Sequence, residues 1–282
     1  MGRKSVSAPV AKKKKQKTKK EFNKYQLYEA SVQCVESDLD FLNEKYKEIR
    51  GKSATPLILR EDFSGTGKLC CEWVKQGKKY VAHGVDLDPE PIEYGKEHHY
   101  GPLSDAQKKQ VTYHQKNVLD ATDIKADIVV AFNFSYFIFK KRRQLLEYFK
   151  EVRKSLRPGG VFFLDLFGGP ESQTLCVEET EYEEGHSYFW DCDKFNPINN
   201  ECIFGIHFKL EGEKRRDFVF KYDWRLWQCG ELQDILEEAG FKHTTVFWEE
   251  DDEDGEGGNG VFYQTKEAEN SESWIAYIGA YS

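Results

Sequence analysis

The sequence predicts an α/β fold: a mainly parallel sheet with an antiparallel β insertion after its fifth strand. Three observations lead to this prediction. From residue 57 to residue 167, short apolar bursts alternate with segments of helical periodicity, which is typical of β-α units. The first burst ends in a glycine-containing turn. Residues 172–222 lack helical periodicity and are dense in β-branched and aromatic residues, which favours antiparallel strands.

The individual elements follow from local patterns. Apolar residues at steps of three and four between Phe22 and Ile49 predict one or two amphipathic helices, which Gly51 ends. The expected strands of the sheet cover residues 57–59, 80–86, 111–114, 127–132, 161–167, 241–248 and 274–281. The expected helices between them cover residues 68–75, 88–99, 140–156 and 230–239. Residues 249–256 hold seven acids in eight positions and are expected to form a solvated loop.

Charge is distributed unevenly along the 282 residues. The chain carries a net charge of −8, but residues 1–20 contain nine Lys or Arg and no acid, so the remainder carries −17. An acidic body repels phosphate chains, which disfavours a bulk nucleic-acid binder. We expect residues 1–21 to be a disordered lysine-rich tail and residues 22–282 to form one domain, with a helical extension at 22–50. Residues 12–20 either only improve solubility or contact nucleic acid or a nuclear import receptor.

Cysteine and histidine patterns give no sign of a metal site. The seven cysteines form no C-x-x-C pair, which argues against both a disulfide framework and a zinc site. Reduced thiols indicate a cytoplasmic or nuclear location.

No apolar run approaches the roughly 18 residues that a membrane span needs, so we expect no membrane partner.

The most informative segment is the turn after the first strand. The strand ends in Glu61 and Asp62, and the turn contains Gly65 and Gly67. In an open parallel sheet, nucleotide ligands bind at this first β-α turn. Asp86 ends the second strand nineteen residues beyond Gly67, a spacing that suits a carboxylate accepting hydrogen bonds from both ribose hydroxyls of an adenosine. Asp88, at a helix start, is better explained as an N-cap.

Charge decides between adenosine cofactors. A dinucleotide would place its pyrophosphate beside Glu61 and Asp62, at a cost on the order of 1 to 4 kcal/mol. S-adenosylmethionine carries an ammonium and a sulfonium, which carboxylates and aromatic faces attract. We therefore expect S-adenosyl-L-methionine as the cofactor. A nicotinamide dinucleotide remains the alternative, with Cys70 at the position of the third glycine of its fingerprint.

Together these segments resemble class I S-adenosylmethionine-dependent methyltransferases, and specifically a plant and bacterial group with a turn like REDFxGT and a second strand ending GVDLDP. The resemblance covers about residues 24–282 and includes the segments 28–33, 133–136, 165–169 and 224–227. Glu61 matches the acid of the class's glycine-rich turn, and Gly65 and Gly67 match its later glycines. Phe63 replaces the first glycine of that turn.

The resemblance implies a Rossmann-like fold with a seven-stranded sheet whose last strand is antiparallel, and with helices on both faces of the sheet. It implies that Glu61 and the glycines hold the methionine part of the cofactor, that Asp86 holds the ribose and that Leu87 packs on the adenine. Leu87 is alternatively ordinary core, and Asn117, expected at the adenine edge, alternatively only caps a turn. The full set of expected cofactor-binding residues is Glu61, Asp62, Phe63, Ser64, Gly65, Gly67, Asp86, Leu87, Asn117, Val118, Asn133 and Phe134.

For the binding site of the methyl acceptor, the sequence suggests candidate residues and leaves their roles open. The residues expected to contact the acceptor are Tyr28, Tyr136, Asp165 and Trp224. A general base is needed only if the acceptor is protonated, and Asp165, Tyr136 and His186 are positional candidates for it. The insertion at 172–222, which includes Trp190, is either a lid with an aromatic wall or an extra core layer.

The sequence thus predicts a methyltransferase that acts on a small molecule by direct in-line transfer. Two alternatives stay open. One is an RNA or protein methyltransferase guided by the basic tail, and the other is a scaffold that binds the cofactor without transferring methyl, suggested by Phe63 in the turn and by the absence of an evident base.

Overall fold

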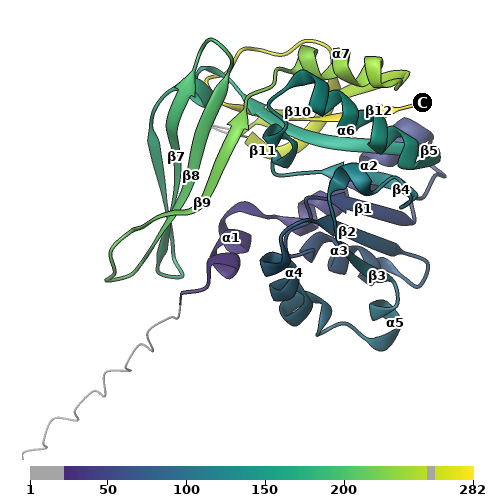
Figure 1. The fold of residues 1–282 in the computed structure, drawn as a ribbon, viewed down its shortest axis with the longest axis horizontal. Coiled ribbons are helices and arrows are strands. Elements are labelled where there is room, and N and C mark those ends of the chain that lie inside the picture. The colour runs from purple at the N-terminus through teal and green to yellow at the C-terminus, as the bar shows by residue number, and fades with distance from the viewer. Residues whose placement is uncertain (1–21, 253–257) are drawn as a thin grey trace, which may run out of the picture.

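The computed structural model describes residues 22–252 and 258–282. The tail expected at residues 1–21, with its lysine-rich block at 12–20, lies outside the described residues, as do residues 253–257 of the acidic segment. The described part contains two sheets, a main sheet and a smaller one that stands beside it (Figure 1).

The main sheet has eight strands in the order β11-β10-β12-β5-β4-β1-β2-β3. Their bounds are β1 Ile58–Asp62, β2 Val81–Asp86, β3 Val111–Gln115, β4 Ala126–Ala131, β5 Leu156–Gly168, β10 His243–Asp251, β11 Gly258–Thr265 and β12 Trp274–Tyr281. Strands β1 to β5 pair in parallel, and β12 pairs antiparallel with both β5 and β10. The predicted mainly parallel α/β fold is therefore confirmed.

The predicted number of seven strands is wrong by one. Strand β11 adds to the free edge of β10 as an antiparallel partner, and Glu249–Asp251, expected in a loop, are the last residues of β10. Most side chains of β11 are exposed, and its short apolar run, Val261 to Tyr263, follows an acidic, glycine-rich segment that is typical of a loop.

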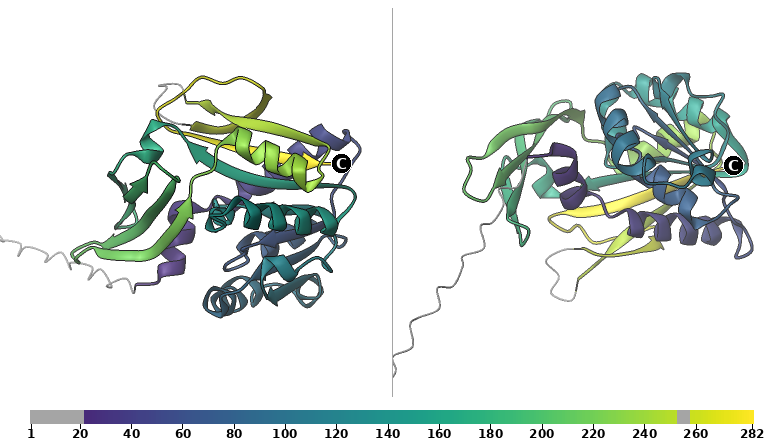
Figure 2. Two further views of the ribbon diagram at one scale, coloured as in Figure 1. Left: turned by 45° about the horizontal axis from the view of Figure 1, so that its top comes forward. Right: turned by 90° about the horizontal axis from the view of Figure 1, so that it is seen from below.

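Helices cover both faces of the main sheet (Figure 2). Their bounds are α1 Lys24–Val32, α2 Val35–Arg50, α3 Lys68–Trp73, α4 Pro89–Gly95, α5 Asp105–Lys108, α6 Arg142–Ser155 and α7 Cys229–Ala239. Helices α6 and α7 pack into the core on one face, and α2 and α3 into the core on the other. Strand β4 is accordingly buried on both sides, which explains its continuous apolar sequence.

Two helix ends bear on the predictions. Helix α2 ends at Arg50, and Gly51 follows with φ 100°, a conformation that glycine adopts readily, so the predicted stop is confirmed. After α6, the residues Arg157 to Gly160 were expected to separate helix from strand. They instead belong to β5, which starts at Leu156 opposite Ala126 of β4.

The smaller sheet follows β5 and is wholly antiparallel, as predicted. Its order is β6-β7-β8-β9, with bounds β6 Val177–Tyr182, β7 His186–Asn196, β8 Glu201–Leu210 and β9 Arg216–Arg225. Figure 1 shows it near the carboxyl end of β5, with α1 on the side of the main sheet. Phe204 and Trp224 on its inner face join the core of the main domain. No helix in the described residues is long and apolar enough to cross a membrane.

Candidate functional site

The turn between β1 and α3 has a left-handed backbone at three positions. Phe63, Gly65 and Gly67 have φ values of 58°, 53° and 64°. Glycine adopts this region without cost, whereas Phe does so rarely. The Phe63 ring packs on the rings of Tyr148 and Phe139, with centroids 5.7 and 6.0 Å apart. This packing explains how the chain keeps a glycine-like conformation at the position where Phe63 replaces the first glycine.

The two glycines of the turn have different surroundings. A Cβ on Gly67 would lie 2.5 Å from the ring of Tyr113, so Gly67 is needed for close packing against β3. A Cβ on Gly65 would meet nothing within 4 Å. Gly65 therefore borders open space, where a ligand can approach the backbone.

Asp86 at the end of β2 ties this turn together. One carboxylate oxygen accepts a hydrogen bond from the backbone N–H of Gly65 at 2.7 Å, and the other accepts one from Asp88 at 2.9 Å. Burial raises the pKa of Asp86. Each oxygen keeps a further lone pair, so the carboxylate can still accept hydrogen bonds from a ligand. Asp88 accepts the N–H of Glu90 and caps α4, as predicted.

Glu61 and Asp62 lie on opposite faces of β1. Glu61 is buried and accepts a hydrogen bond from the Cys70 thiol at 3.2 Å, and burial raises its pKa to about 8. Asp62 is also buried, but Arg60 donates to both of its oxygens at 2.8 Å and Tyr148 donates a third bond. The Asp62 carboxylate is paired on the face of β1 opposite to Glu61. Its expected role at the cofactor stays a prediction.

The remaining residues expected at the cofactor differ in accessibility. The Ser64 hydroxyl is buried beside Gly84 and has no hydrogen-bond partner. Leu87 is 65% exposed, which rules out the core alternative. Asn117 accepts the N–H of Leu119 and so caps a short turn, and Val118 is buried. Neither observation assigns Asn117 or Val118 to a ligand.

The loop after β4 is held by Asp165. Asn133 and Phe134 have φ values of 56° and 57°, and their N–H groups donate to the two oxygens of Asp165 at 2.7 and 2.9 Å. Burial raises the pKa of Asp165 to about 7. Tyr136 is fully buried and donates to the backbone carbonyl of Asp165 at 2.8 Å. Asp165 therefore supports the loop, and the expected contacts of Tyr136 and Asp165 with an acceptor stay predictions.

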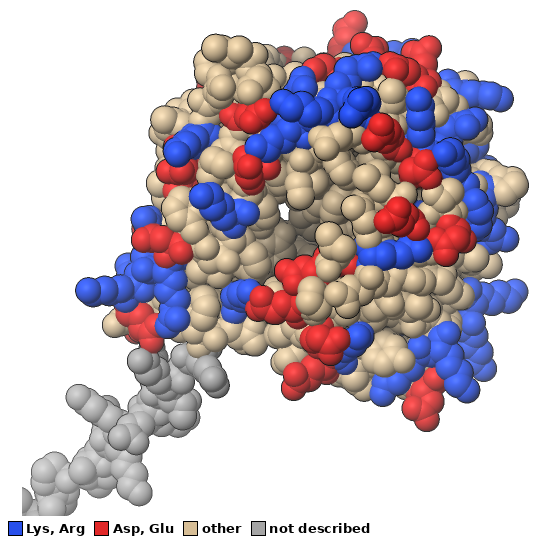
Figure 3. Space-filling view, viewed as in Figure 1, with Lys and Arg blue, Asp and Glu red and all other residues tan. Residues whose placement is uncertain are grey.

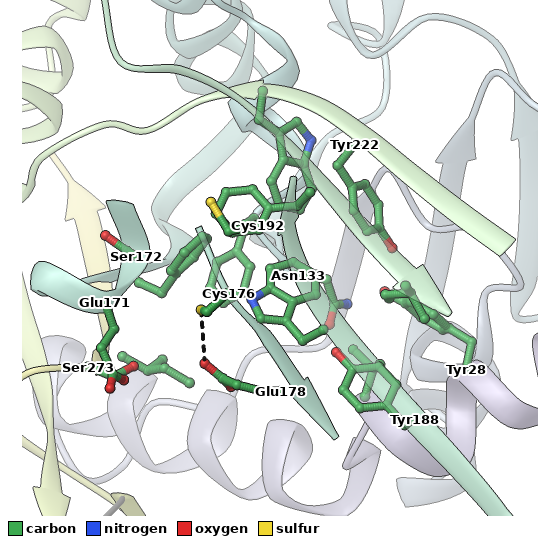
Figure 4. Close-up of a pocket in the computed structure, with 18 residues that line it drawn as sticks. Tyr28, Asn133, Glu171, Ser172, Cys176, Glu178, Tyr188, Cys192, Tyr222 and Ser273 are labelled. Carbon is green, nitrogen blue, oxygen red and sulfur yellow. Dashed lines mark hydrogen bonds between the residues drawn. The ribbon is translucent and has the colours of Figure 1, made fainter. Parts of the chain in front are cut away.

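A cavity of about 260 Å³ lies beyond this loop, between the two sheets (Figure 4). The residues that line it come from α1, the loop after β4, the end of β5 and the smaller sheet; they include Tyr28, Asn133, Phe134, Glu171, Cys176, Glu178, Tyr188, Trp190, Phe204, Tyr222 and Trp224. Figure 3 shows the surface hollowed in this region, with mainly uncharged side chains on its walls.

Four of the predicted residues, Tyr28, Asn133, Phe134 and Trp224, thus meet at one cavity. Tyr188 and Tyr222 were not predicted, although each lies two residues from an aromatic neighbour that also lines the cavity, and this period of two marks one face of a strand. His186 does not line the cavity. It contacts the Ser31 hydroxyl at 3.3 Å and stacks on Tyr182.

Helix α1 connects the turn to the smaller sheet. Its buried Glu29 accepts a hydrogen bond from the Thr66 hydroxyl at 2.8 Å and lies 2.7 Å from Nε2 of His99. Burial alone would raise the pKa of Glu29, but these hydrogen bonds from His99 and Thr66 lower it below its ordinary value. On the other side of α1, Tyr28 packs on Phe220 of β9 with centroids 5.0 Å apart. Sequence reasoning missed Glu29, whose partners are distant in the chain.

Comparison with known families identifies the segment that carries this turn. Residues 64–162 match the model of a methyltransferase domain. This part of the chain is similar to a methyltransferase domain. The match begins in the glycine turn at Ser64 and runs through Asp86 and the loop after β4 to the middle of β5. The predicted enzyme class, a methyltransferase, is confirmed.

Relatives of the methyltransferase domain agree with this assignment. The chain is 23% identical over 186 residues to "Putative methyltransferase YqeM" of Bacillus subtilis (strain 168), covering 63% of this chain and 70% of that protein. An S-adenosylmethionine-dependent methyltransferase from Clostridium acetobutylicum ATCC 824 superposes with a TM-score of 0.66 at 16% identity, over 91% of this chain and 97% of its own. SAM-bound CalS10, an amino pentose methyltransferase from Micromonospora echinaspora, superposes with a TM-score of 0.65 at 13% identity. This match covers 95% of this chain and 100% of the CalS10 chain. At identities this low, the two structures show that the fold is shared and no more.

Proposed function

We propose that the protein transfers the methyl group of S-adenosylmethionine to a small-molecule acceptor bound between its two sheets. The observation that carries this proposal is the position of the loop 133–134. It follows β4 at the carboxyl edge of the parallel strands, where the turn and Asp86 also lie, and its side chains line the cavity. Donor and acceptor would meet at this loop.

The residues of the turn fit the methyl donor. Gly65 leaves room for a ligand, the buried Ser64 hydroxyl has no partner, and Asp86 keeps free lone pairs for the two ribose hydroxyls. Glu61, with Asp86 nearby, would face the cationic end of the donor. Leu87 is exposed at the end of β2, where an adenine ring can pack on it.

A small acceptor is supported by the shape and chemistry of the cavity. A volume of about 260 Å³ between α1 and the smaller sheet suits a compact molecule better than a folded macromolecule. CalS10, which shares the fold, is named as a methyltransferase of an amino pentose, also a small molecule.

Transfer requires little acid-base chemistry from the protein. When bound, S-adenosylmethionine supplies an already activated methyl group, so orientation accounts for most of the acceleration. Asp165 fixes the backbone of Asn133 and Phe134, and α1 closes the space between turn and cavity. These contacts would hold the acceptor in line with the donor and keep water out.

The experiment is to incubate the full chain with S-adenosylmethionine labelled in its methyl group and a cell extract separated into small molecules, RNA and protein. The proposal expects label in the small-molecule fraction. Label in RNA or protein that disappears on deletion of residues 1–20 would favour the tail-guided alternative. Cofactor binding with no transfer to any fraction would favour the scaffold.

A further inference from the structure

We propose that the acceptor is an amine with an apolar body, whose cationic form is attracted into the cavity by aromatic faces and two carboxylates. This inference rests on the proposed methyl transfer and adds the chemical class of the substrate. It is carried by the lining of the cavity between the two sheets.

The first observation is a group of stacked aromatic rings on the wall formed by the smaller sheet. Trp190 stacks on Phe204 with centroids 4.9 Å apart, and Tyr222 stacks on Trp224 at 4.3 Å. The two pairs adjoin, because Trp190 and Tyr222 lie 6.1 Å apart. Aromatic faces attract a cation, and the attraction is larger where water is displaced. This wall can therefore hold both an apolar body and a positive charge.

The second observation is the sign of the charges at the cavity. Glu171 and Glu178 are among the lining residues, and no Lys, Arg or His is found among the described residues that line it. Glu178 on β6 pairs with Trp190 on β7, and in Figure 4 the Glu171 side chain lies near Ser273. Two negative charges without a positive one favour a cation and repel a carboxylate or phosphate acceptor.

The third observation concerns polar groups that add no charge. The hydroxyls of Tyr28, Tyr188 and Tyr222 lie on the side of the cavity that also holds the amide of Asn133 (Figure 4). Tyr222 donates a hydrogen bond to Tyr28, and burial raises the pKa of Tyr28 to about 12. The hydroxyls therefore stay neutral, and they can orient an amine by accepting its N–H bonds.

The reaction balances without a further reagent. A bound ammonium first loses a proton to water at the open mouth of the cavity. The lone pair of the amine nitrogen then forms the N–C bond, while the C–S bond breaks and its electron pair stays on sulfur, which becomes a neutral thioether. The product is a methylated ammonium, which leaves with its charge or loses a proton to solvent.

Three probes of similar size test the charge preference: phenethylamine, which is cationic, 2-phenylethanol, which is neutral, and phenylacetate, which is anionic. Their affinities would be measured by calorimetry on the full chain saturated with S-adenosylhomocysteine. The variants are Glu178→Gln and Glu171→Gln. The matched control is Glu179→Gln, an exposed neighbour on β6 that does not line the cavity.

Phenethylamine should bind at least about tenfold more tightly than phenylacetate. Each of the two variants should weaken the amine roughly three- to tenfold and leave 2-phenylethanol within about twofold, while Glu179→Gln changes neither. Phenylacetate binding as tightly as phenethylamine, no binding of the amine, or an equal loss in Glu179→Gln would overturn the inference. Titration of the ligand-free chain with S-adenosylmethionine separates the two claims: if it binds, only the amine preference has failed, and if it does not, the proposed function has failed.

Discussion

The backbone N–H of Gly65 donates a hydrogen bond of 2.7 Å to Asp86, so the turn after β1 is fastened to the end of β2. The two residues are 21 positions apart in the chain. Their contact places the open side of the turn beside a carboxylate with free lone pairs. The proposed methyl-donor site is built around this pair, and the predictions below begin with it.

Asp86→Asn should weaken S-adenosylmethionine binding by at least about tenfold, because an amide accepts fewer and weaker hydrogen bonds from a ribose diol than a carboxylate does. The fold should survive, since the amide oxygen can still accept the N–H of Gly65 or Asp88. Calorimetric titration measures the loss. Asp88→Asn is the control: it removes the same charge two residues away, yet Asn caps a helix as well as Asp does, so affinity should not change.

Alanine substitutions at the two glycines of the turn should have different effects, one mainly on the free energy of unfolding and the other mainly on cofactor affinity. Gly67→Ala should lower the free energy of unfolding by more than about 2 kcal/mol, because its Cβ would overlap the Tyr113 ring at a positive φ. Gly65→Ala should cost only about 1 kcal/mol of stability, yet it should reduce cofactor affinity, because its Cβ occupies space that is open to a ligand. Urea unfolding and calorimetry test the pair. Equal losses of stability would contradict the assignment of Gly65 to the ligand side.

The free energy of unfolding of the ligand-free protein should fall as pH rises from about 4.5 to about 8. Burial raises the pKa of Glu61 from 4.5 to about 8 and that of Asp165 from 3.8 to about 7. The folded protein therefore binds more protons than the unfolded chain in this window, and it loses that stabilisation as the two groups ionise. Urea unfolding at several pH values measures the slope, which Glu61→Gln should reduce.

The same carboxyl should release a proton when the cationic donor binds at neutral pH. A nearby positive charge lowers the pKa of Glu61, so binding below pH 8 ionises it. The binding enthalpy of the wild type should then differ between phosphate and Tris buffers, which have different heats of ionisation. In Glu61→Gln the difference should shrink. An unchanged difference would show that Glu61 does not face the donor.

Glu29→Gln should loosen helix α1 from the turn. The amide can still accept one hydrogen bond, but it loses the charge that faces His99 and Lys68, so we expect a loss of about 1 to 3 kcal/mol in stability. Cofactor affinity should also fall if α1 closes the site. Glu36→Gln, at an exposed position on α2, is the control. Hydrogen exchange of α1 amides would show directly whether the helix opens more often.

Most of the main sheet could be predicted from the sequence, because its central strands are buried on both faces and appear as apolar bursts. Strand β12 at Trp274–Tyr281 was predicted with its exact bounds. Strand β11 was missed because its apolar run, Val261 to Tyr263, is short and follows an acidic, glycine-rich segment that is typical of a loop. The start of β5 was missed because Pro158 and the two glycines after it usually end an element, whereas here they continue a strand.

The candidate site was predictable where sequence spacing alone fixes the geometry. Asp86 and Gly65 meet because both follow neighbouring parallel strands. The hydrogen bond between Asp62 and Tyr148 could not be predicted, because the two residues are 86 positions apart in the chain. Glu29 could not be predicted, since its contacts with Thr66 and His99 depend on how α1 packs.

The most direct test of the central claim is a parallel titration of the full chain with S-adenosylmethionine and with NADH. At a pH above 8, where Glu61 is ionised, the account predicts saturable binding of S-adenosylmethionine that Asp86→Ala abolishes, and no binding of NADH, whose pyrophosphate would lie against the Glu61 carboxylate. Saturable binding of NADH, with no heat from S-adenosylmethionine, would contradict it.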